Sequence, residues 1–184
     1  MQLSPLQLLE YTFDGISVTP VDGYVADPEF STGLVFFPGK LALSAETGLV
    51  LLTEESSYSD FGVKLTLRVG PKEDNLAPYH VQVTVRGVVR MHLTQATGQA
   101  EERRVRSLVN GVSLLYGVVR EMVSNITSRA TYGQLLLPSL NFSDLASQKA
   151  GNLAIASKPV LNAPKVKARK ITGSKEKTKA KAKA

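Results

Sequence analysis

The stretch from Leu115 to Phe142 constrains the fold most, because it joins the end of a long amphipathic helix to an apolar connection that cannot be helical. In its first half, apolar residues recur every three or four positions, which is the spacing of one helix face. In its second half, Pro138 lacks a backbone donor and drives the preceding residue toward extended geometry. A connection as apolar as this one needs either a partner or a cover.

The apolar periodicity predicts a helix from about Glu101 to Arg129. Its apolar stripe consists of Val105, Leu108, Val112, Leu115, Val119, Met122 and Ile126. At 1.5 Å per residue the helix would be roughly 40 Å long, so we expect it to be too long to pack only on a small sheet of its own. A second, weaker helix is expected after Asn141 and fades near Gly151.

Four β-rich stretches precede the helix. Phe61–Val69 and Tyr79–Leu93 alternate apolar and polar residues, as strands with one buried face do, and Gly87 permits a bulge in the second of them. Leu8–Val18 alternates imperfectly, and Lys40–Thr53 is the fourth stretch. Short links between successive strands favour an antiparallel meander. We therefore expect an α+β fold, in which a four-stranded antiparallel sheet packs with one long and one short C-terminal helix.

Composition sets the outer bounds. A chain of 184 residues with 43% hydrophobic content predicts one compact domain with a substantial core. The absence of cysteine excludes disulfides and thiolate chemistry, so nothing indicates an oxidising compartment. Neither a secretory leader nor an apolar run of membrane-spanning length is evident in the sequence, and we expect a cytoplasmic, soluble protein.

The net charge of +6 is unevenly divided along the chain. Residues 1–157 contain 12 Lys and Arg against 15 Asp and Glu, or −3, whereas residues 158–184 contain 10 against 1, or +9. We expect a folded domain at 1–157 and a disordered Lys/Ala-rich tail at 158–184. The tail either serves as a solvated end or attracts RNA, ribosomes, anionic lipid or an acidic protein. It holds no aromatic residue, so base stacking is not favoured.

The sequence offers little for catalysis. His80 and His92 lie twelve residues apart on a predicted strand, with no serine, carboxylate or cysteine spacing that makes a triad or a metal site. The neighbouring acids Glu54-Glu55, Glu73-Asp74 and Glu101-Glu102 are best explained as solvated charge. We predict that the protein is not an enzyme and uses neither a metal nor a cofactor.

Apolar residues outside the helical stripe are the remaining candidates for function. They are Leu41, Leu43, Tyr132, the run Leu135–Leu137, Leu140 and Phe142. One interpretation places them in the core of the domain. The other makes them a groove that holds extended, apolar polypeptide, with about 25 cal/mol for each Å² of apolar surface buried. Binding of that kind is nearly blind to sequence.

The order of four strands, a long helix, a crossover and a short final helix resembles that of the SecB protein-export chaperones. The similarity covers roughly residues 7 to 145. It is carried by Lys40–Leu43, Arg120-Glu121, Ser128–Tyr132, Gln134, Leu135, Leu137 and Asn141-Phe142. These are similar to the family's KLDL-type second strand, RE pair, SRGTF-type helix end, QLNL-type crossover and NF opening of the last helix.

The resemblance implies an ATP-independent holdase that binds non-native preproteins and passes them to the SecA motor. It also implies a homotetramer, built as a dimer of dimers, with the long helices between the sheets. By the same resemblance, Leu41 and Leu43 line a client groove, and Tyr132, Leu135, Leu137 and Phe142 cover it. Asp14, Glu73 and Asp74 fall near the acidic positions that the family offers to SecA. The oligomer interface is expected at Val112, Val119 and Met122.

The chain departs from the family pattern at several points. Ala130 and Gly133 stand where the family usually has glycine and proline, Pro138 is shifted by one position, and a basic tail replaces the family's acidic one. Two alternatives therefore stay open. One is a dedicated SecB-like chaperone for a single client, such as the antitoxin of a toxin–antitoxin system. The other is a non-chaperone scaffold or RNA-associated protein that acts through its tail.

Overall fold

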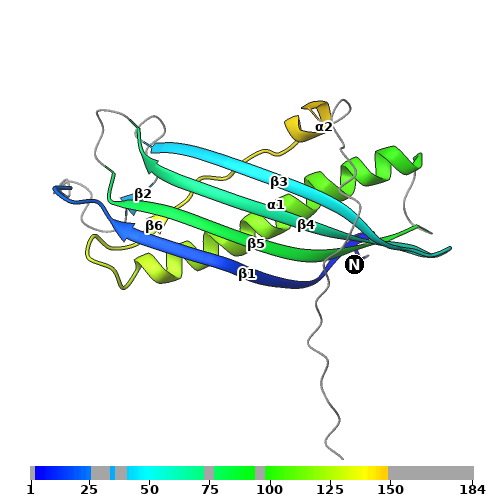
Figure 1. Cartoon of the computed structure of the whole chain (residues 1–184), viewed down its shortest axis with the longest axis horizontal. Helices are drawn as coiled ribbons and strands as arrows, with labels where there is room; N and C mark the ends of the chain where they lie inside the picture. The colour runs from blue at the N-terminus through cyan, green and yellow to red at the C-terminus, as the bar shows by residue number, and fades with distance from the viewer. Residues whose placement is uncertain (1–2, 26–33, 36–40, 73–76, 94–97, 149–184) are drawn as a thin grey trace, which may run out of the picture.

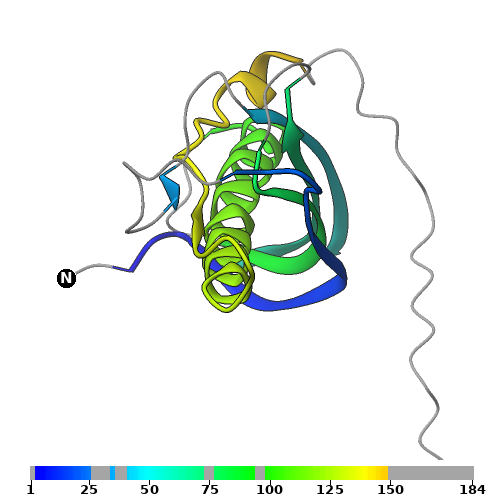
Figure 2. The same cartoon turned by 90° about the vertical axis from the view of Figure 1, so that its left-hand side faces the viewer.

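The computed structural model describes residues 3–25, 34–35, 41–72, 77–93 and 98–148. The described elements are β1 (Leu6–Pro20), β2 (Leu34–Val35), β3 (Leu41–Glu54), β4 (Tyr58–Pro71), β5 (Tyr79–His92), α1 (Ala100–Thr127), β6 (Leu135–Leu136) and α2 (Asp144–Gln148). Four long strands form one antiparallel sheet in the order β1-β5-β4-β3, and α1 lies along one face of it (Figure 1). In the turned view the sheet curls around the helix (Figure 2). The predicted α+β fold is confirmed.

The alternation of the two central strands determines which of their side chains enter the core. On β5 every second side chain from Tyr79 to Met91 is buried and faces α1, whereas His80, Gln82 and Arg86 point to the opposite face. The same alternation on β4 buries its odd-numbered residues from 59 to 69. We call the face of the sheet that points away from α1 the outer face. Full burial of one valine or leucine contributes roughly 1.5–3 kcal/mol, so these two strands supply much of the core.

The strand order differs from a simple meander. Strands β3, β4 and β5 follow one another, but β1 pairs with β5 and not with β3. The pairing of β1 shifts register between Leu8 and Glu10 and again between Phe13 and Gly15, which explains its imperfect alternation. The bulge expected at Gly87 is therefore on the partner strand. Gly87 itself is needed for a close approach, because a Cβ there would lie 2.8 Å from Leu115 Cδ2.

Helix α1 matches the sheet in length. Its 28 residues span about 42 Å at 1.5 Å per residue, and strands of 14 or 15 residues span about 46 to 50 Å. The expectation that the helix outreaches its own sheet was therefore wrong, because β1 and β4 extend beyond the stretches Leu8–Val18 and Phe61–Val69 that were predicted for them. Past Val119 the buried positions are Val123 and Thr127, whereas Met122 and Ile126 are only partly buried.

A short parallel pair of strands lies apart from the main sheet. Leu34 of β2 pairs with Leu135 of β6, and Val35 pairs with Leu136. The second helix, α2, is confirmed from Asp144 to Gln148, and the continuation expected toward Gly151 lies outside the described residues, as does the basic tail. Within the described part of the chain, no helix is both long enough and apolar enough to cross a membrane.

Candidate functional site

The segment that follows α1, which we call the crossover, runs from Ser128 to Phe142. Helix α1 ends in tight turns, in which the N–H of Ala130 donates to the carbonyl of Thr127 and the N–H of Gly133 donates to the carbonyl of Ala130. Gly133 has a φ of 79°, in the left-handed region that glycine adopts without strain. Proline fixes φ near −65°, so the local backbone explains why this chain carries glycine and not the proline usual in the resembled pattern.

Tyr79 fastens the start of the crossover to β5. Its hydroxyl donates to the carbonyl of Gly133 at 2.9 Å and accepts from the N–H of Tyr132, also at 2.9 Å. The ring of Tyr132 lies 5.0 Å from that of Tyr24 and 5.8 Å from that of Tyr79. The Tyr132 hydroxyl in turn donates to the carbonyl of Val21 at 3.2 Å. Three tyrosines thus tie the crossover to β5 and to the chain that follows β1.

Side chains of α1 hold the rest of the crossover. The Thr127 hydroxyl accepts from the N–H of Leu135 at 2.8 Å, and Arg120 Nε donates to the carbonyl of Leu137 at 3.1 Å. The remaining contacts are Tyr116 Oη donating to the Pro138 carbonyl at 2.6 Å and Gln134 Nε2 donating to Ser124 Oγ. Polar groups that a buried connection would otherwise leave unpaired are satisfied in this way. The crossover is therefore a braced segment.

The crossover alternates buried and exposed leucines. Leu135 and Leu137 are each 2% exposed, whereas Leu136 between them is 42% exposed. Phe142 is 8% exposed, and its ring meets that of Tyr116 edge to face at 5.4 Å. Three of the residues predicted to cover a groove, Leu135, Leu137 and Phe142, thus belong to the core of the protomer. The exposed Leu136 lies in the leucine run considered as apolar surface, but it was not among the residues predicted to cover the groove.

The other predicted groove residues lie at the border of the core. Leu41 and Leu43 are half-buried on β3, which is an edge strand, and Tyr132 is half-buried at the start of the crossover. Leu140 and Leu145, at the far end of the crossover and in α2, are also partly buried against the same core. Figures 1 and 2 place α2 on the β3 side of the molecule. We call Leu41, Leu43, Leu136, Leu140 and Leu145 the apolar rim.

Burial affects the two tyrosines that bind the crossover carbonyls. It raises the pKa of the Tyr116 hydroxyl to about 12, against a smaller opposing effect of the Arg120 charge. Burial also raises the pKa of Tyr79, and the hydrogen bond from Tyr132 opposes that shift. Both hydroxyls are therefore protonated donors at neutral pH.

The predicted partner-contact residues are less available than their sequence indicated. Asp14 Oδ1 lies 2.7 Å from Arg86 Nε, so its charge is already paired. Glu73 and Asp74 lie outside the described residues. Val112 and Val119 are 0% exposed and face the sheet, so they offer no surface to a second copy. Of the predicted oligomer residues, Met122 alone keeps partial exposure.

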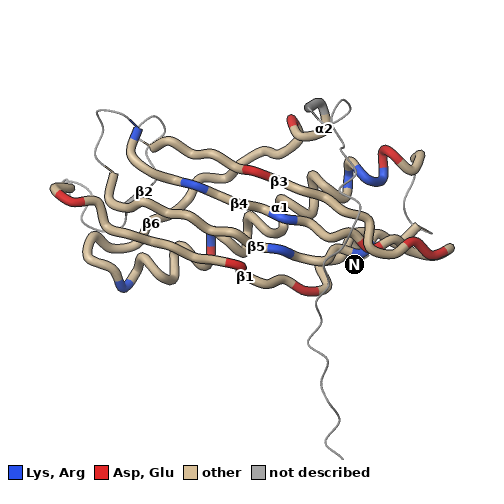
Figure 3. The backbone as a smooth tube through the Cα atoms, in the orientation of Figure 1, with Lys and Arg blue, Asp and Glu red and all other residues tan. Residues whose placement is uncertain are grey.

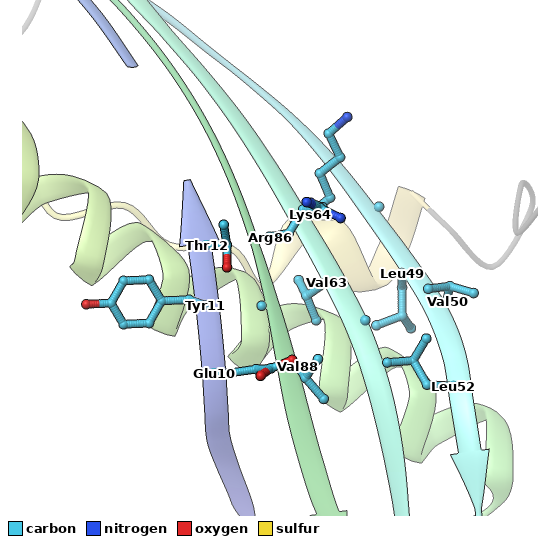
Figure 4. A pocket seen from close by; sticks show the side chains of 13 residues that line it. Glu10, Tyr11, Thr12, Leu49, Val50, Leu52, Val63, Lys64, Arg86 and Val88 are labelled. Atoms are coloured by element: carbon cyan, nitrogen blue, oxygen red, sulfur yellow. The ribbon is translucent and has the colours of Figure 1, made fainter. Parts of the chain in front are cut away.

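The outer face of the sheet carries a second feature, a hollow of about 460 Å³ (Figure 4). Acidic and basic positions are interspersed along the sheet strands (Figure 3). Ion pairs join neighbouring strands on the outer face. These pairs are Arg68–Glu46, Arg86–Asp14 and Arg90–Asp60. We call the cavity the outer hollow; it is lined by Glu10, Thr12, Val50, Leu52, Gly62, Lys64, Arg86 and Val88, among others.

In the described part of the chain, histidines and carboxylates do not gather into a metal-binding cluster at the crossover or in the outer hollow. Among the described residues, no group of three or more His, Asp or Glu could hold a metal ion. His80 and His92 sit on β5 as strand residues. What the arrangement can do is bind apolar and charged surface. The bracing residues Tyr79, Tyr116 and Thr127 were not predicted as functional, although a threonine and a tyrosine in a helical apolar stripe are a signal that each hydroxyl has a buried partner.

One family model and two solved structures are similar to this chain. The model of a family described as preprotein translocase subunit SecB matches residues 42–152. Among solved structures, the Mycobacterium tuberculosis SecB-like chaperone Rv1957, in complex with a ChAD peptide from the Rv1956 HigA1 antitoxin, is similar at 17% identity and a TM-score of 0.45, over 74% of this chain and 88% of that chain. A Streptococcus agalactiae protein of unknown function is similar at 9% identity and a TM-score of 0.47, over 72% of this chain and 96% of that chain. A search of curated protein sequences found no match.

Proposed function

The chain belongs to the SecB family, and from this premise we propose that it is an ATP-independent holdase for non-native polypeptides, acting in the cytoplasm. The observation that carries the proposal is the apolar rim, in which leucines of an edge strand, of the crossover and of α2 keep part of their surface open to water. Each Å² of apolar surface that a client covers contributes about 25 cal/mol. Several such contacts on one particle give useful affinity without a defined sequence.

The braced crossover supports the same proposal. The leucines of a holdase surface have to stay exposed to solvent instead of folding into the core. An ordered backbone keeps Leu136 exposed between two buried leucines. The hydrogen bonds from Thr127, Arg120 and Tyr116 fix the backbone on both sides of it. The exposed leucine therefore stands on a rigid support, which limits the ordering entropy lost when a client binds.

An aggregation assay tests the proposal directly. A chemically unfolded protein is diluted into buffer with the full chain, and light scattering is followed for the parent, Leu136→Asp and Leu43→Asp. We expect both variants to suppress aggregation less well than the parent at equal concentration. Leu3→Asp, at an apolar position 78% exposed near the N-terminus, is the matched control and should behave as the parent does. Equal suppression by the parent, Leu43→Asp and Leu136→Asp would remove the rim from the proposal.

The core residues are unsuitable for that assay. Leu135 and Leu137 are each 2% exposed, so an aspartate at either position would place an unpaired charge in the core and unfold the protomer. Loss of activity in such a variant would report folding and not binding. Circular dichroism of each rim variant should therefore match that of the parent before its suppression is compared.

The proposal also covers the clients, the partner protein and the assembly of the chain. Clients are preproteins for Sec-dependent export, passed to SecA, and the working particle is a homotetramer in which uncovered faces of α1 meet. Because Asp14 is paired with Arg86, docking of SecA would have to depend on Glu73 and Asp74. Client range separates this from the dedicated chaperone: suppression of aggregation for several unrelated unfolded proteins supports the export holdase, and activity on one antitoxin alone contradicts it.

The basic tail is tested separately. We propose that residues 158–184, with a charge of +9, contact acidic surfaces, RNA or anionic lipid and are dispensable for holding clients. A chain truncated after residue 157 should retain suppression of aggregation and lose retention on heparin. Loss of client holding in the truncated chain would favour the scaffold or RNA-associated alternative.

A further inference from the structure

Arg120 of α1 carries a charge that no described carboxylate neutralises. Its side chain is exposed, and its Nε donates to the carbonyl of Leu137 at 3.1 Å. Among the described residues, neither Glu121, the next residue along the helix, nor Asp144 of α2 forms an ion pair with it. A guanidinium has donors on all three of its nitrogens. Both terminal nitrogens of Arg120 therefore remain available to an anion.

The hydrogen bond to Leu137 holds this charge beside the exposed leucine of the crossover. Leu136 directly precedes Leu137, and it is 42% exposed, whereas Leu137 is 2% exposed. The bond lengths along that path place Arg120 Nε within about 10 Å of the Leu136 backbone. Strand β6, which contains Leu136, packs along α1 (Figure 1). A fixed cation and an exposed leucine therefore lie next to each other on the protein surface.

A polypeptide that covers Leu136 also removes water from Arg120. Removing water from an unpaired charge is unfavourable unless an opposite charge takes its place. A carboxylate on the covering chain replaces that water with charge-assisted hydrogen bonds, and a guanidinium can form two parallel bonds of this kind with one carboxylate. Because Nε is already held by the Leu137 carbonyl, less side-chain entropy is lost when the carboxylate binds. The rim therefore favours acidic over neutral segments at this point.

Resting on the proposed holdase function, we propose that Arg120 determines client specificity at the crossover part of the apolar rim. It selects extended segments in which an acidic residue stands two positions from an aliphatic one. Side chains two residues apart lie on the same side of an extended chain, about 7 Å from each other, which is compatible with the separation of Arg120 and Leu136. The aliphatic side chain covers Leu136, and the carboxylate binds the terminal nitrogens of Arg120.

The shape of the surface at Leu136 favours an extended polypeptide over a fatty acid. Both ligands offer a carboxylate and an aliphatic group, but a fatty acid gains its affinity in a concave site that encloses most of its chain. Leu136 stands between Leu135 and Leu137, which are each 2% exposed, so its side chain is a protrusion. An extended chain can lie across a protrusion and place further side chains on other leucines of the rim. A polypeptide is therefore the occupant that fits.

Fluorescence anisotropy with the full chain tests this preference. The probe is a labelled, end-capped peptide of sequence SLSLSESLSLS, in which leucine stands two positions from glutamate in both directions. SLSLSQSLSLS replaces the carboxylate by an amide of nearly equal size, and SLSLSKSLSLS reverses the charge. We expect the glutamate peptide to bind about threefold to tenfold more tightly than the glutamine peptide and the lysine peptide to bind most weakly. The difference between the glutamate and glutamine peptides should shrink as salt is added.

Variants of Arg120 assign the preference to its charge. Arg120→Gln should bind the glutamate and glutamine peptides equally, whereas Arg120→Lys should retain part of the preference. Arg129→Gln removes an exposed arginine outside the apolar rim and is the matched control, so it should discriminate as the parent does. Leu136→Ala should weaken binding of the glutamate peptide, because the apolar contact is smaller.

The role of Arg120 and the holdase function would fail in different ways. Equal binding of the glutamate and glutamine peptides by a parent chain that suppresses aggregation would overturn the role of Arg120 and leave the holdase function intact. The same conclusion follows if the ratio of the two affinities is unchanged in Arg120→Gln, if Leu136→Ala binds as the parent does, or if laurate displaces the peptide from the parent. A parent chain that neither suppresses aggregation nor binds any peptide would overturn both.

Discussion

The hydroxyl of Thr127 lies 2.8 Å from the backbone nitrogen of Leu135, and both groups are shielded from solvent. Thr127 Oγ1 donates its own proton to the carbonyl of Val123 at 2.7 Å, so its lone pairs are free to accept from Leu135. One side chain in the last turn of α1 thus closes the helix and anchors the crossover. Without it, a buried N–H would have no partner.

Thr127→Val should therefore destabilise the protomer. The shape is conserved, but the Leu135 N–H is left unsatisfied in the core, which costs about 2 kcal/mol. Urea unfolding followed by circular dichroism measures the change as a lower midpoint at an unchanged slope. The same substitution at the exposed Thr131 is the control and should leave the free energy of unfolding within about 0.5 kcal/mol of that of the parent. Equal effects at both positions would contradict the bracing role of Thr127.

The two glycines of α1 should respond to alanine in opposite directions. A Cβ at Gly117 meets nothing within 4 Å, so Gly117→Ala gains about 0.5–1 kcal/mol from helix propensity alone. A Cβ at Gly111 would lie 2.8 Å from Val63 Cγ2, so Gly111→Ala forces the helix away from β4 and costs about 1–3 kcal/mol. Thermal unfolding of the two variants should show melting temperatures on either side of that of the parent.

Alkaline pH should weaken the fold through Tyr116. Its folded-state pKa is about 12, and an unfolded tyrosine titrates near 10, so the folded chain keeps a proton that the unfolded chain loses. The stability from this group is fully present below pH 10 and is lost as pH rises from about 10 to 12, by roughly 2–3 kcal/mol. Tyr116→Phe should be less stable at pH 7, because Pro138 loses its donor, but its stability should fall less steeply over that range.

Stability curves at several pH values between 8 and 12 check this prediction. Tyr11→Phe, which removes the hydroxyl of a side chain 50% exposed, is the matched control and should retain the slope of the parent. An identical slope in the parent and in Tyr116→Phe would mean that the Tyr116 hydroxyl titrates elsewhere than burial indicates.

Local sequence patterns predict the long helix and the central strands, but they do not predict the order of the strands. The alternation of Phe61–Val69 and Tyr79–Leu93 predicts two half-buried strands, and the structure has both, as a longer β4 and as a β5 that ends one residue earlier. Periodicity also predicts α1 to within two residues at either end. Strand order is different, because alternation says which face a residue takes and not which strand is its neighbour. The place of β1 beside β5 depends on long-range pairing that no local signal encodes.

The candidate site could be predicted only in outline. The run Leu135–Leu137 is uniform, so the sequence gives no phase: it does not indicate that the middle side chain is the exposed one. That phase is set by the hydrogen bonds of Thr127 and Arg120 to the residues on either side. The outer hollow was not foreseen, since Glu10, Gly62 and Lys64 converge only through strand register.

The uncovered face of α1 is where a second copy of the chain should bind. Val112 and Val119 are sealed against the sheet, but Leu114 is 41% exposed on the helix, and Met122 is partly exposed. Leu114→Glu should therefore lower the mass of the assembly measured by light scattering after size exclusion, because a charge in a helix–helix interface has no partner. Thr131→Glu, an added charge in the turn after the helix, should leave the mass unchanged. A parent chain that is monomeric at all concentrations, or a Leu114→Glu variant of the same mass as an oligomeric parent, would exclude this face as the interface.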